Sequence, residues 1–340
     1  MKEHISIAVT GDAMLGRGVN ESIRRFGPAY PWGDTLNEMR AADLTLINLE
    51  CVIARGGRPW SRWPKVFHFK ADPVAIESLL LAGIDGVSLA NNHTLDFEEE
   101  AFVEMLNLLD RNRIAHAGAG RNIEEARRPA LFETDGGRVA LVSFTDNEPG
   151  WLATEEGLGT NWIPITLSEA SLAPARENIA RAREAGADLV IFSIHWGPNM
   201  VERPIPLFRE FARAVMEAGA DVYLGHSSHV FQGIEIYRGR PIIYDAGDFV
   251  DDYAVDSRLR NDWGFLFRLR VAERNVQRVE LVPTLIGRCQ VNFATGNTRE
   301  AIIERLDERS AGMGTTIHRE DNRCWIECRA ATPLREAANG

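Results

Sequence analysis

Residues 185–195 read AGADLVIFSIH, and residues 218–226 read AGADVYLGH. Each stretch joins the end of a helix to an Ala-Gly turn, an apolar strand and a terminal histidine. Glycine suits the end of a helix because it adopts the left-handed conformation without steric cost. The strands are apolar almost without a break, which indicates burial on both faces, as in a parallel sheet covered by helices. A variant of the same unit, AGIDGVSLANNH, occupies residues 82–93.

Other apolar segments extend this pattern and then change it. The first group resembles the parallel strands above, whereas the segments after residue 233 are joined by short turns and predict antiparallel strands. We therefore predict an α/β fold with two mixed sheets. The first group is ISIAVT (5–10), LTLIN (44–48) and VALVSF (139–144), and the second is GIEIY (233–237), PIIYDAG (241–247), FLFRLRV (265–271) and VQRVELV (276–282).

The chain has no convincing linker before about residue 290. We therefore predict one domain over residues 1–290. Residues 291–340 should form a C-terminal extension, helical around 298–309 and ending in an irregular tail.

The composition of the chain limits the classes of partner that it can bind. The chain has 340 residues, of which 45% are apolar and 26% charged, as in globular proteins. Its 38 Lys and Arg against 49 Asp and Glu give a net charge of -11, which disfavours nucleic acid and anionic lipid as partners. The N-terminal segment is too short and polar for a signal peptide, and no run is long enough for a membrane span.

Cysteine usage indicates the cellular compartment. The four cysteines have neither paired CxxC spacing nor the density of a secreted scaffold. We expect reduced thiols in a cytoplasmic protein without a membrane anchor.

Oxygen and imidazole side chains follow the predicted strands. In open α/β folds, ligands bind outside the carboxyl ends of the parallel strands. Each residue alone has a simpler explanation, since Asp is common in turns and caps and a single His is often structural. Their joint placement predicts a metal site. The residues are Asp12, Glu50, Asn92, His93, Asp146, His195, His226 and His229.

A mixed nitrogen and oxygen ligand set suits Mn, Zn or Fe better than Ca or Mg. We expect one or two divalent ions, bridged by one carboxylate if there are two. Such ions generate hydroxide near neutral pH and stabilise the charge of a transition state.

Three residues have candidate roles beside the metal. His93 follows Asn92 and is a candidate general acid or base. Asp96 either orients its imidazole or caps a helix beginning near Phe97. Arg17 either clamps an anionic oxygen or is a solvated surface residue.

Other segments remain open or are excluded. Asp245 and Asp248 are candidate supporting or substrate groups, and WSRWPK (60–65) either lines a substrate groove or forms an ordinary loop. GDAMLGRG (11–18) lacks the order of a phosphate loop and of a dinucleotide motif. Ser227 and Ser228 have no GxSxG context, so serine-nucleophile chemistry is not supported.

Six ordered motifs between about residues 5 and 285 resemble the CapA/PgsA family, which is named for poly-γ-glutamate capsule synthesis. That family is similar to calcineurin-like metallophosphoesterases, so the resemblance implies a four-layer α/β/β/α sandwich. It also implies that Asp12, Glu50, Asn92, His195, His226 and His229 are metal-site positions and that His93 matches the acid/base histidine. The motifs are GDAMLGR (11–17), NLE (48–50), FHFKADP (67–73), NNHTLDF (91–97), SIHWG (193–197) and GHSSHVFQGIEIYRGRPIIYDAGDF (225–249).

The chain departs from the metallophosphoesterase pattern at three places. Met14 stands where the Asp-x-His motif has its histidine, Glu50 of NLE replaces the Gly-Asp-x-x-Asp carboxylate, and His226 and His229 are separated by two serines instead of one residue. These departures make one bound ion an alternative to two.

Three functions fit these residues. We expect a metal-dependent hydrolase acting on an anionic or peptide-like substrate, either a γ-glutamyl amide or a phosphoester. One alternative is a peptide epimerase that removes an α-carbon proton, since members of the wider family are associated with that reaction. The other is a non-catalytic protein that binds a polymer or a partner.

Overall fold

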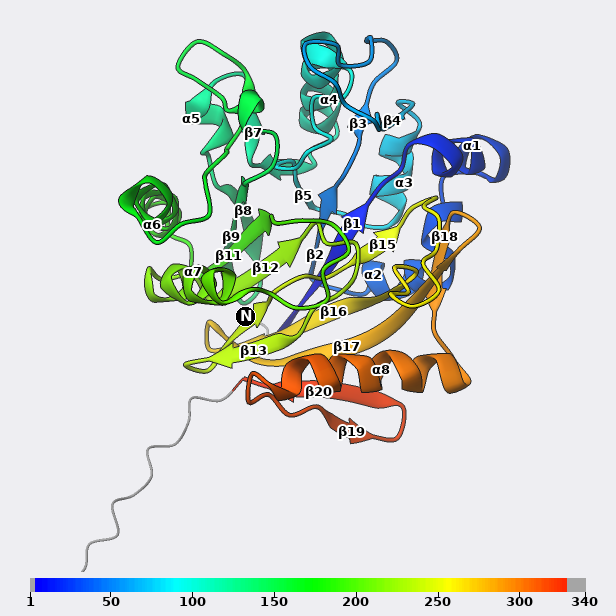
Figure 1. The fold of residues 1–340 in the computed structure, drawn as a ribbon, viewed down its shortest axis with the longest axis vertical. Coiled ribbons are helices and arrows are strands. Elements are labelled where there is room, and N and C mark those ends of the chain that lie inside the picture. Colours follow the sequence, from blue (N-terminus) through cyan, green and yellow to red (C-terminus); the bar gives the residue numbers. More distant parts are fainter. Residues whose placement is uncertain (1–3, 329–340) are drawn as a thin grey trace, which may run out of the picture.

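The computed structural model describes residues 4–328 and contains two large sheets that lie face to face (Figure 1). In the larger sheet the strand order is β19-β20-β17-β16-β1-β2-β5-β6, with β15 beside β1 and β18 beside β17. Its strands are β1 (Ile5–Ala13), β2 (Leu44–Leu49), β5 (Gly86–Ser88), β6 (Ala115–Ala117), β15 (Asp248–Val250), β16 (Trp263–Ala272), β17 (Asn275–Gly287), β18 (Gln290–Phe293), β19 (His318–Glu320) and β20 (Arg323–Glu327).

The smaller sheet has the order β13-β14-β12-β11-β9-β8. Two short pairs, β3 with β4 and β7 with β10, lie apart from both large sheets. The strands are β8 (Ala130–Thr134), β9 (Gly137–Thr145), β11 (Leu189–His195), β12 (Val222–His226), β13 (Ile234–Tyr237), β14 (Arg240–Ile243), β3 (Val52–Ile53), β4 (Lys70–Ala71), β7 (Ala119–Gly120) and β10 (Gly159–Thr160).

Three apolar clusters separate four layers. Ile7 of β1 and Ile191 of β11 belong to the cluster between the two sheets. Phe102 packs with Ile47 under the helices of the larger sheet, and Phe211 packs with the smaller sheet on its outer side. The predicted α/β/β/α sandwich is therefore confirmed. The helices are α1 (Arg17–Phe26), α2 (Leu36–Arg40), α3 (Ala75–Leu81), α4 (Glu98–Arg111), α5 (Ile123–Ala126), α6 (Glu169–Glu184), α7 (Pro206–Glu217) and α8 (Gly296–Ala311).

The predicted strand directions are also confirmed. Strands β1, β2, β5 and β6 run parallel to one another, as do β9, β11, β12 and β14. The later segments, β13 with β14 and β16 with β17, form antiparallel pairs. His195 and His226 are register partners at the ends of β11 and β12, so the sheet itself places the two imidazoles side by side.

Residues after 290 continue the larger sheet. Helix α8 covers the segment predicted to be helical, and the hairpin of β19 and β20 pairs with β17. The domain boundary at residue 290 stays a prediction of the sequence. The predicted irregular tail, 329–340, lies outside the described residues.

Two further observations concern membrane-spanning helices and disulfide bonds. No helix within residues 4–328 is long and apolar enough to cross a membrane. All four cysteines are unpaired, and Cys51, Cys324 and Cys328 are buried.

Two glycines hold the sheets together at the end where the histidines lie. A β-carbon on Gly11 of β1 would be 1.7 Å from the Gly247 carbonyl oxygen, and one on Gly225 of β12 would be 2.0 Å from the Tyr244 carbonyl oxygen. Hydrogen bonds follow from this close approach, because Asp12 N donates to Gly247 O at 3.0 Å and Ala246 N donates to Gly225 O at 2.8 Å. The segment 244–247 thus joins a strand of each sheet through backbone contacts.

We expect Gly11→Ala to destabilise the protein by about 1–3 kcal/mol. The added methyl group would meet the Gly247 backbone, which cannot move aside as a flexible side chain could. Thermal unfolding of the purified variant measures the effect. Gly56→Ala is the control, because no atom lies within 4 Å of a β-carbon there. Equal melting temperatures for the two variants would contradict the close approach of β1 to residue 247.

Candidate metal centre

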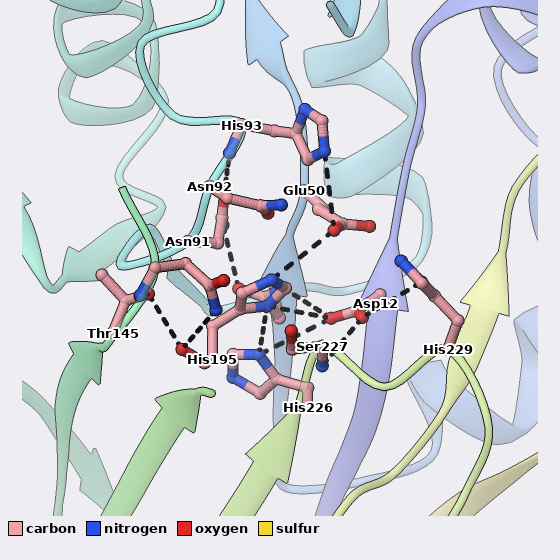
Figure 2. A network of polar contacts seen from close by, with 12 residues as sticks. Asp12, Glu50, Asn91, Asn92, His93, Thr145, His195, His226, Ser227 and His229 are labelled. Carbon is pink, nitrogen blue, oxygen red and sulfur yellow. Dashed lines mark hydrogen bonds and ion pairs between the residues drawn. The ribbon is translucent and has the colours of Figure 1, made fainter. Parts of the chain in front are cut away.

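Asp12, His195 and His226 form one group of ligand atoms at the carboxyl ends of the parallel strands. Nδ1 of His195 and Nδ1 of His226 are 2.9 Å apart. Oδ1 of Asp12 lies 3.7 Å from the first of these nitrogens and 3.6 Å from the second. Figure 2 shows the three side chains converging from both sheets. Such a group can hold a divalent ion.

Asp12 belongs to a second group as well, with Glu50, His229 and Asp248. His229 Nδ1 lies 2.8 Å from Asp248 Oδ1 and 3.9 Å from Asp12 Oδ2. Nε2 of His195 lies 3.7 Å from Glu50 Oε1, which connects the two groups. If both groups bind an ion, Asp12 is therefore the carboxylate placed to bridge them.

Neutral groups fix the orientation of these ligands. Asn48 Nδ2 donates to Asp12 Oδ1 at 2.7 Å, and Ser227 N donates to Asp12 Oδ2 at 3.2 Å. Ser193 Oγ lies 2.8 Å from His226 Nε2, which leaves Nδ1 to face Asp12. Partners of this kind select the tautomer and ring orientation of a ligating histidine. Sequence analysis missed Asn48 and Ser193, although both lie in strands that end at a predicted ligand.

Four buried atoms beside these groups have no hydrogen-bond partner among residues 4–328: Glu50 Oε1, Asn92 Oδ1, His195 Nε2 and Asp248 Oδ2. A buried polar atom without a partner is costly, so each such atom calls for an explanation. All four are of the types that bind Mn, Zn or Fe. The residues therefore fit a metal centre.

The pKa values of the carboxyl groups lead to the same conclusion. Burial raises the pKa of Asp12, but its contact with His195 and the charges of His195, His226 and His229 hold that pKa well below its usual value. Burial and the charge of Asp12 raise the pKa of Glu50, and burial with the charges of Asp251 and Asp12 raises that of Asp248. A divalent cation would supply the positive charge that allows these groups to ionise together.

His93 stands next to the ligand groups and is held by two acidic residues. Its Nδ1 lies 2.5 Å from Asp96 Oδ2. Figure 2 shows its Nε2 facing Glu50 Oε1, at a distance of 4.0 Å. Asp96 also accepts a hydrogen bond from Phe69 N and caps no helix, since no side chain caps α4. Of the two predicted roles for Asp96, the geometry favours orienting the imidazole. Burial and the charge of Lys65 lower the pKa of His93 well below its usual value, so the ring is neutral at neutral pH.

Lys65 contacts the loop that carries His93. Its Nζ donates to the Asn92 carbonyl at 2.6 Å and lies 3.3 Å from Glu148 Oε1 and 3.5 Å from Asp96 Oδ1. The lysine side chain is only 8% exposed, which is unusual for this residue type. The segment 60–65 was the signal for it in the sequence.

A cavity of about 590 Å³ opens onto His93, Asn92 and His229. Phe67, Phe69 and Tyr253 make its apolar wall, and Arg17 and Lys65 contribute positive charge. The ring of Phe69 stacks on His93 with centroids 4.0 Å apart. The cavity is therefore suited to a ligand with both methylene groups and carboxylates.

Arg17, Asp146 and Met14 are among the residues singled out in the sequence that lie outside both ligand groups. Arg17 lines the cavity, where its Nε donates to Asp252 Oδ2 at 3.1 Å. Asp146 Oδ1 accepts a hydrogen bond from Gly197 N. Met14 is fully buried, and its sulfur accepts a hydrogen bond from Gly16 N. The roles predicted for Arg17 and for the metal ligands stay predictions.

Comparison with known proteins gives a family match over most of the chain. The family model described as "Bacterial capsule synthesis protein PGA_cap" matches residues 6–253. This range contains both ligand groups, His93 and the apolar wall of Phe67, Phe69 and Tyr253.

Among relatives, a "Probable polyglutamine synthesis accessory protein" of Mycobacterium tuberculosis is 28% identical, with 94% of each chain covered. The "Capsule biosynthesis protein CapA" of Bacillus anthracis is also 28% identical, over 74% of this chain and 60% of that protein. Among solved structures, TT1561 of Thermus thermophilus has a TM-score of 0.42 and 12% identity, with 79% of this chain and 98% of that chain covered.

We expect His195→Ala and His226→Ala each to lower the bound metal substantially, because either change removes an imidazole from the group around Asp12. Elemental analysis of the purified, folded variants measures the metal content. His116→Ala is the matched control, since His116 pairs with Asp110 and belongs to neither ligand group. Full metal content in both site variants would remove the assignment of this centre.

Proposed function

The chain belongs to the PGA_cap family of bacterial capsule synthesis proteins, and from this we propose that it is a metal-dependent hydrolase of γ-glutamyl amide bonds in an anionic peptide. The observation that carries the proposal is the set of unpartnered ligand atoms beside His93. The printed names of the relatives, which concern polyglutamine synthesis and capsule biosynthesis, support the choice of substrate.

Asp12, Glu50, Asn92, His195, His226, His229 and Asp248 are the residues we propose to hold the metal. When bound, a divalent ion acts as a Lewis acid and lowers the pKa of water near it. The remaining steps belong to the side chains of this chain.

We assign proton transfer to His93. Its neutral imidazole accepts a proton from the attacking water and gives it to the nitrogen of the scissile amide. The C–N bond breaks, the water oxygen stays on the carbonyl carbon, and the second water proton leaves to solvent as the new carboxylate forms. Asp96 is a positioning residue, because its contact with Nδ1 keeps Nε2 directed at the centre.

The cavity supports recognition of an acidic substrate. Arg17 and Lys65 attract carboxylates, while Phe69 and Tyr253 offer apolar surface to the methylene groups of a glutamyl residue. Both cations already have acidic partners, Lys65 with Glu148 and Arg17 with Asp252, and Arg17, whose side chain is 36% exposed, is the more exposed of the two.

The test is a panel of γ-linked and α-linked glutamyl peptides and phosphoesters, supplied to metal-loaded protein. Hydrolysis of γ-linked peptides is expected. Preference for phosphoesters would replace the proposed substrate class. Solvent deuterium at the α-carbon of unhydrolysed peptide would point to epimerisation instead, and metal binding without any turnover would favour a binding protein.

We expect His93→Asn to leave the metal content nearly intact and to lower turnover by about 10²–10⁴-fold, the usual contribution of a positioned acid or base. Steady-state kinetics with parallel elemental analysis measure both effects, and His116→Asn serves as the control. Loss of the metal in H93N would make His93 a ligand, and unchanged turnover would end its catalytic role.

A further inference from the structure

A second cavity, of about 620 Å³, lies on the outer face of the antiparallel half of the larger sheet. It is formed by β16, β17 and β20, with Arg299 of α8 and Glu38 of α2 at its margins. Figure 1 shows these strands at the opposite end of the molecule from α4. No residue of this cavity belongs to the centre described above.

The strand register gathers arginines on this face. Leu269 of β16 and Val279 of β17 point into the core between the sheets, so their neighbours in sequence point outward. Arg268 is the register partner of Glu280, whereas Arg270 is the partner of Arg278. Like charges directly opposite each other destabilise a pair of strands. The sheet therefore accepts an unfavourable pair at this point.

The acidic residues of the cavity do not balance the arginines. Arg268, Arg270 and Arg278 all share Glu280, at 3.6, 3.0 and 2.7 Å, and Arg268 also pairs with Glu38. Arg323 is exposed and makes no ion pair with any of residues 4–328 that the structure records. Arg299 pairs with Glu300 outside the cavity, so the excess of positive charge comes from Arg323 and from the arginines around Glu280, in a chain whose net charge is -11. Its lining includes five arginines, Arg268, Arg270, Arg278, Arg299 and Arg323, against three glutamates, Glu38, Glu280 and Glu320.

Burial makes this excess more significant. The Arg268 side chain is only 14% exposed, and its Nε has no hydrogen-bond partner among the described residues. Guanidinium groups that are partly buried and underneutralised attract anions strongly, because the surroundings screen them less than water does. Trp325 adds an aromatic wall and lies under the Arg278 guanidinium at 5.8 Å.

We propose that this arginine cavity, defined by Arg268, Arg270, Arg278, Arg299, Arg323 and Trp325, binds the side-chain carboxylates of an acidic peptide. Guanidinium groups match carboxylates geometrically, since two parallel N–H donors meet two oxygens. Trp325 offers apolar surface to the methylene groups between backbone and carboxylate. That the peptide is a glutamate polymer rests on the proposed function. That the cavity binds an acidic peptide rests on its charge alone.

A site of this kind would hold one part of a polymer while another part reaches the metal centre. Binding two segments of the same chain raises the effective concentration of the second segment at its own site. Long substrates would then bind more tightly than short ones without any change in the chemistry at His93.

The experiment measures the fluorescence anisotropy of a short, fluorescein-labelled γ-linked oligoglutamate. The protein carries H93N, so that the proposed hydrolase does not consume the probe. R278E and R323E are each expected to weaken binding by about tenfold or more, the effect of losing one charge-assisted contact. R111E, at the exposed end of α4, is the charge-matched control and should leave the affinity unchanged.

Unchanged affinity in both cavity variants, with melting temperatures equal to that of the parent, would overturn the proposal. Displacement of the probe by tripolyphosphate or single-stranded DNA at lower concentrations than by unlabelled oligoglutamate would also overturn it. Loss of affinity in R278E and R323E is expected whether or not the native protein hydrolyses any γ-glutamyl peptide. The two proposals can therefore fail separately.

Discussion

The buried charge of Asp12 is the constraint on which the rest of the site depends. Its carboxyl group is 1% exposed and is kept ionised by hydrogen bonds and by three histidines. An ionised carboxylate in the interior is costly unless paired charges and donors surround it. The parallel strands of both sheets therefore end in residues that serve this one group, with His195 and His226 from the smaller sheet and Asn48 from the larger.

Much of this arrangement could be predicted from the sequence because strand ends are encoded locally. Continuous apolar runs fix where β11 and β12 end, and the parallel pairing then places His195 and His226 together. Apolar periodicity does not encode how loops turn beyond the strands. The sequence offered Asp245 and Asp248 as equal candidates, and only the folded chain shows that Asp248 contacts His229. Likewise, the sequence did not distinguish Lys65 from the other residues of the loop 60–65, where it alone contacts the Asn92 carbonyl.

The C-terminal part shows a second limit of prediction from the sequence. The hairpin of β19 and β20 is exposed and polar along much of its length, so its sequence lacks the apolar run that marks a strand. Its position is set by pairing with β17, an interaction between segments far apart in sequence. The arginine cavity arises from this pairing and had no signal of its own, since each arginine alone is typical of a solvated strand.

The closure of segment 244–247 over Gly11 and Gly225 has a consequence for how the protein is made. Asp12 emerges from the ribosome near the start of synthesis, but the groups that complete its surroundings come from the second sheet and from the chain after it. Until the chain through Asp248 has been released and both sheets have paired, Asp12 has neither His229 nor the backbone at Gly247 beside it. An ion held by both ligand groups would therefore enter late, after the chain through Asp248 has folded.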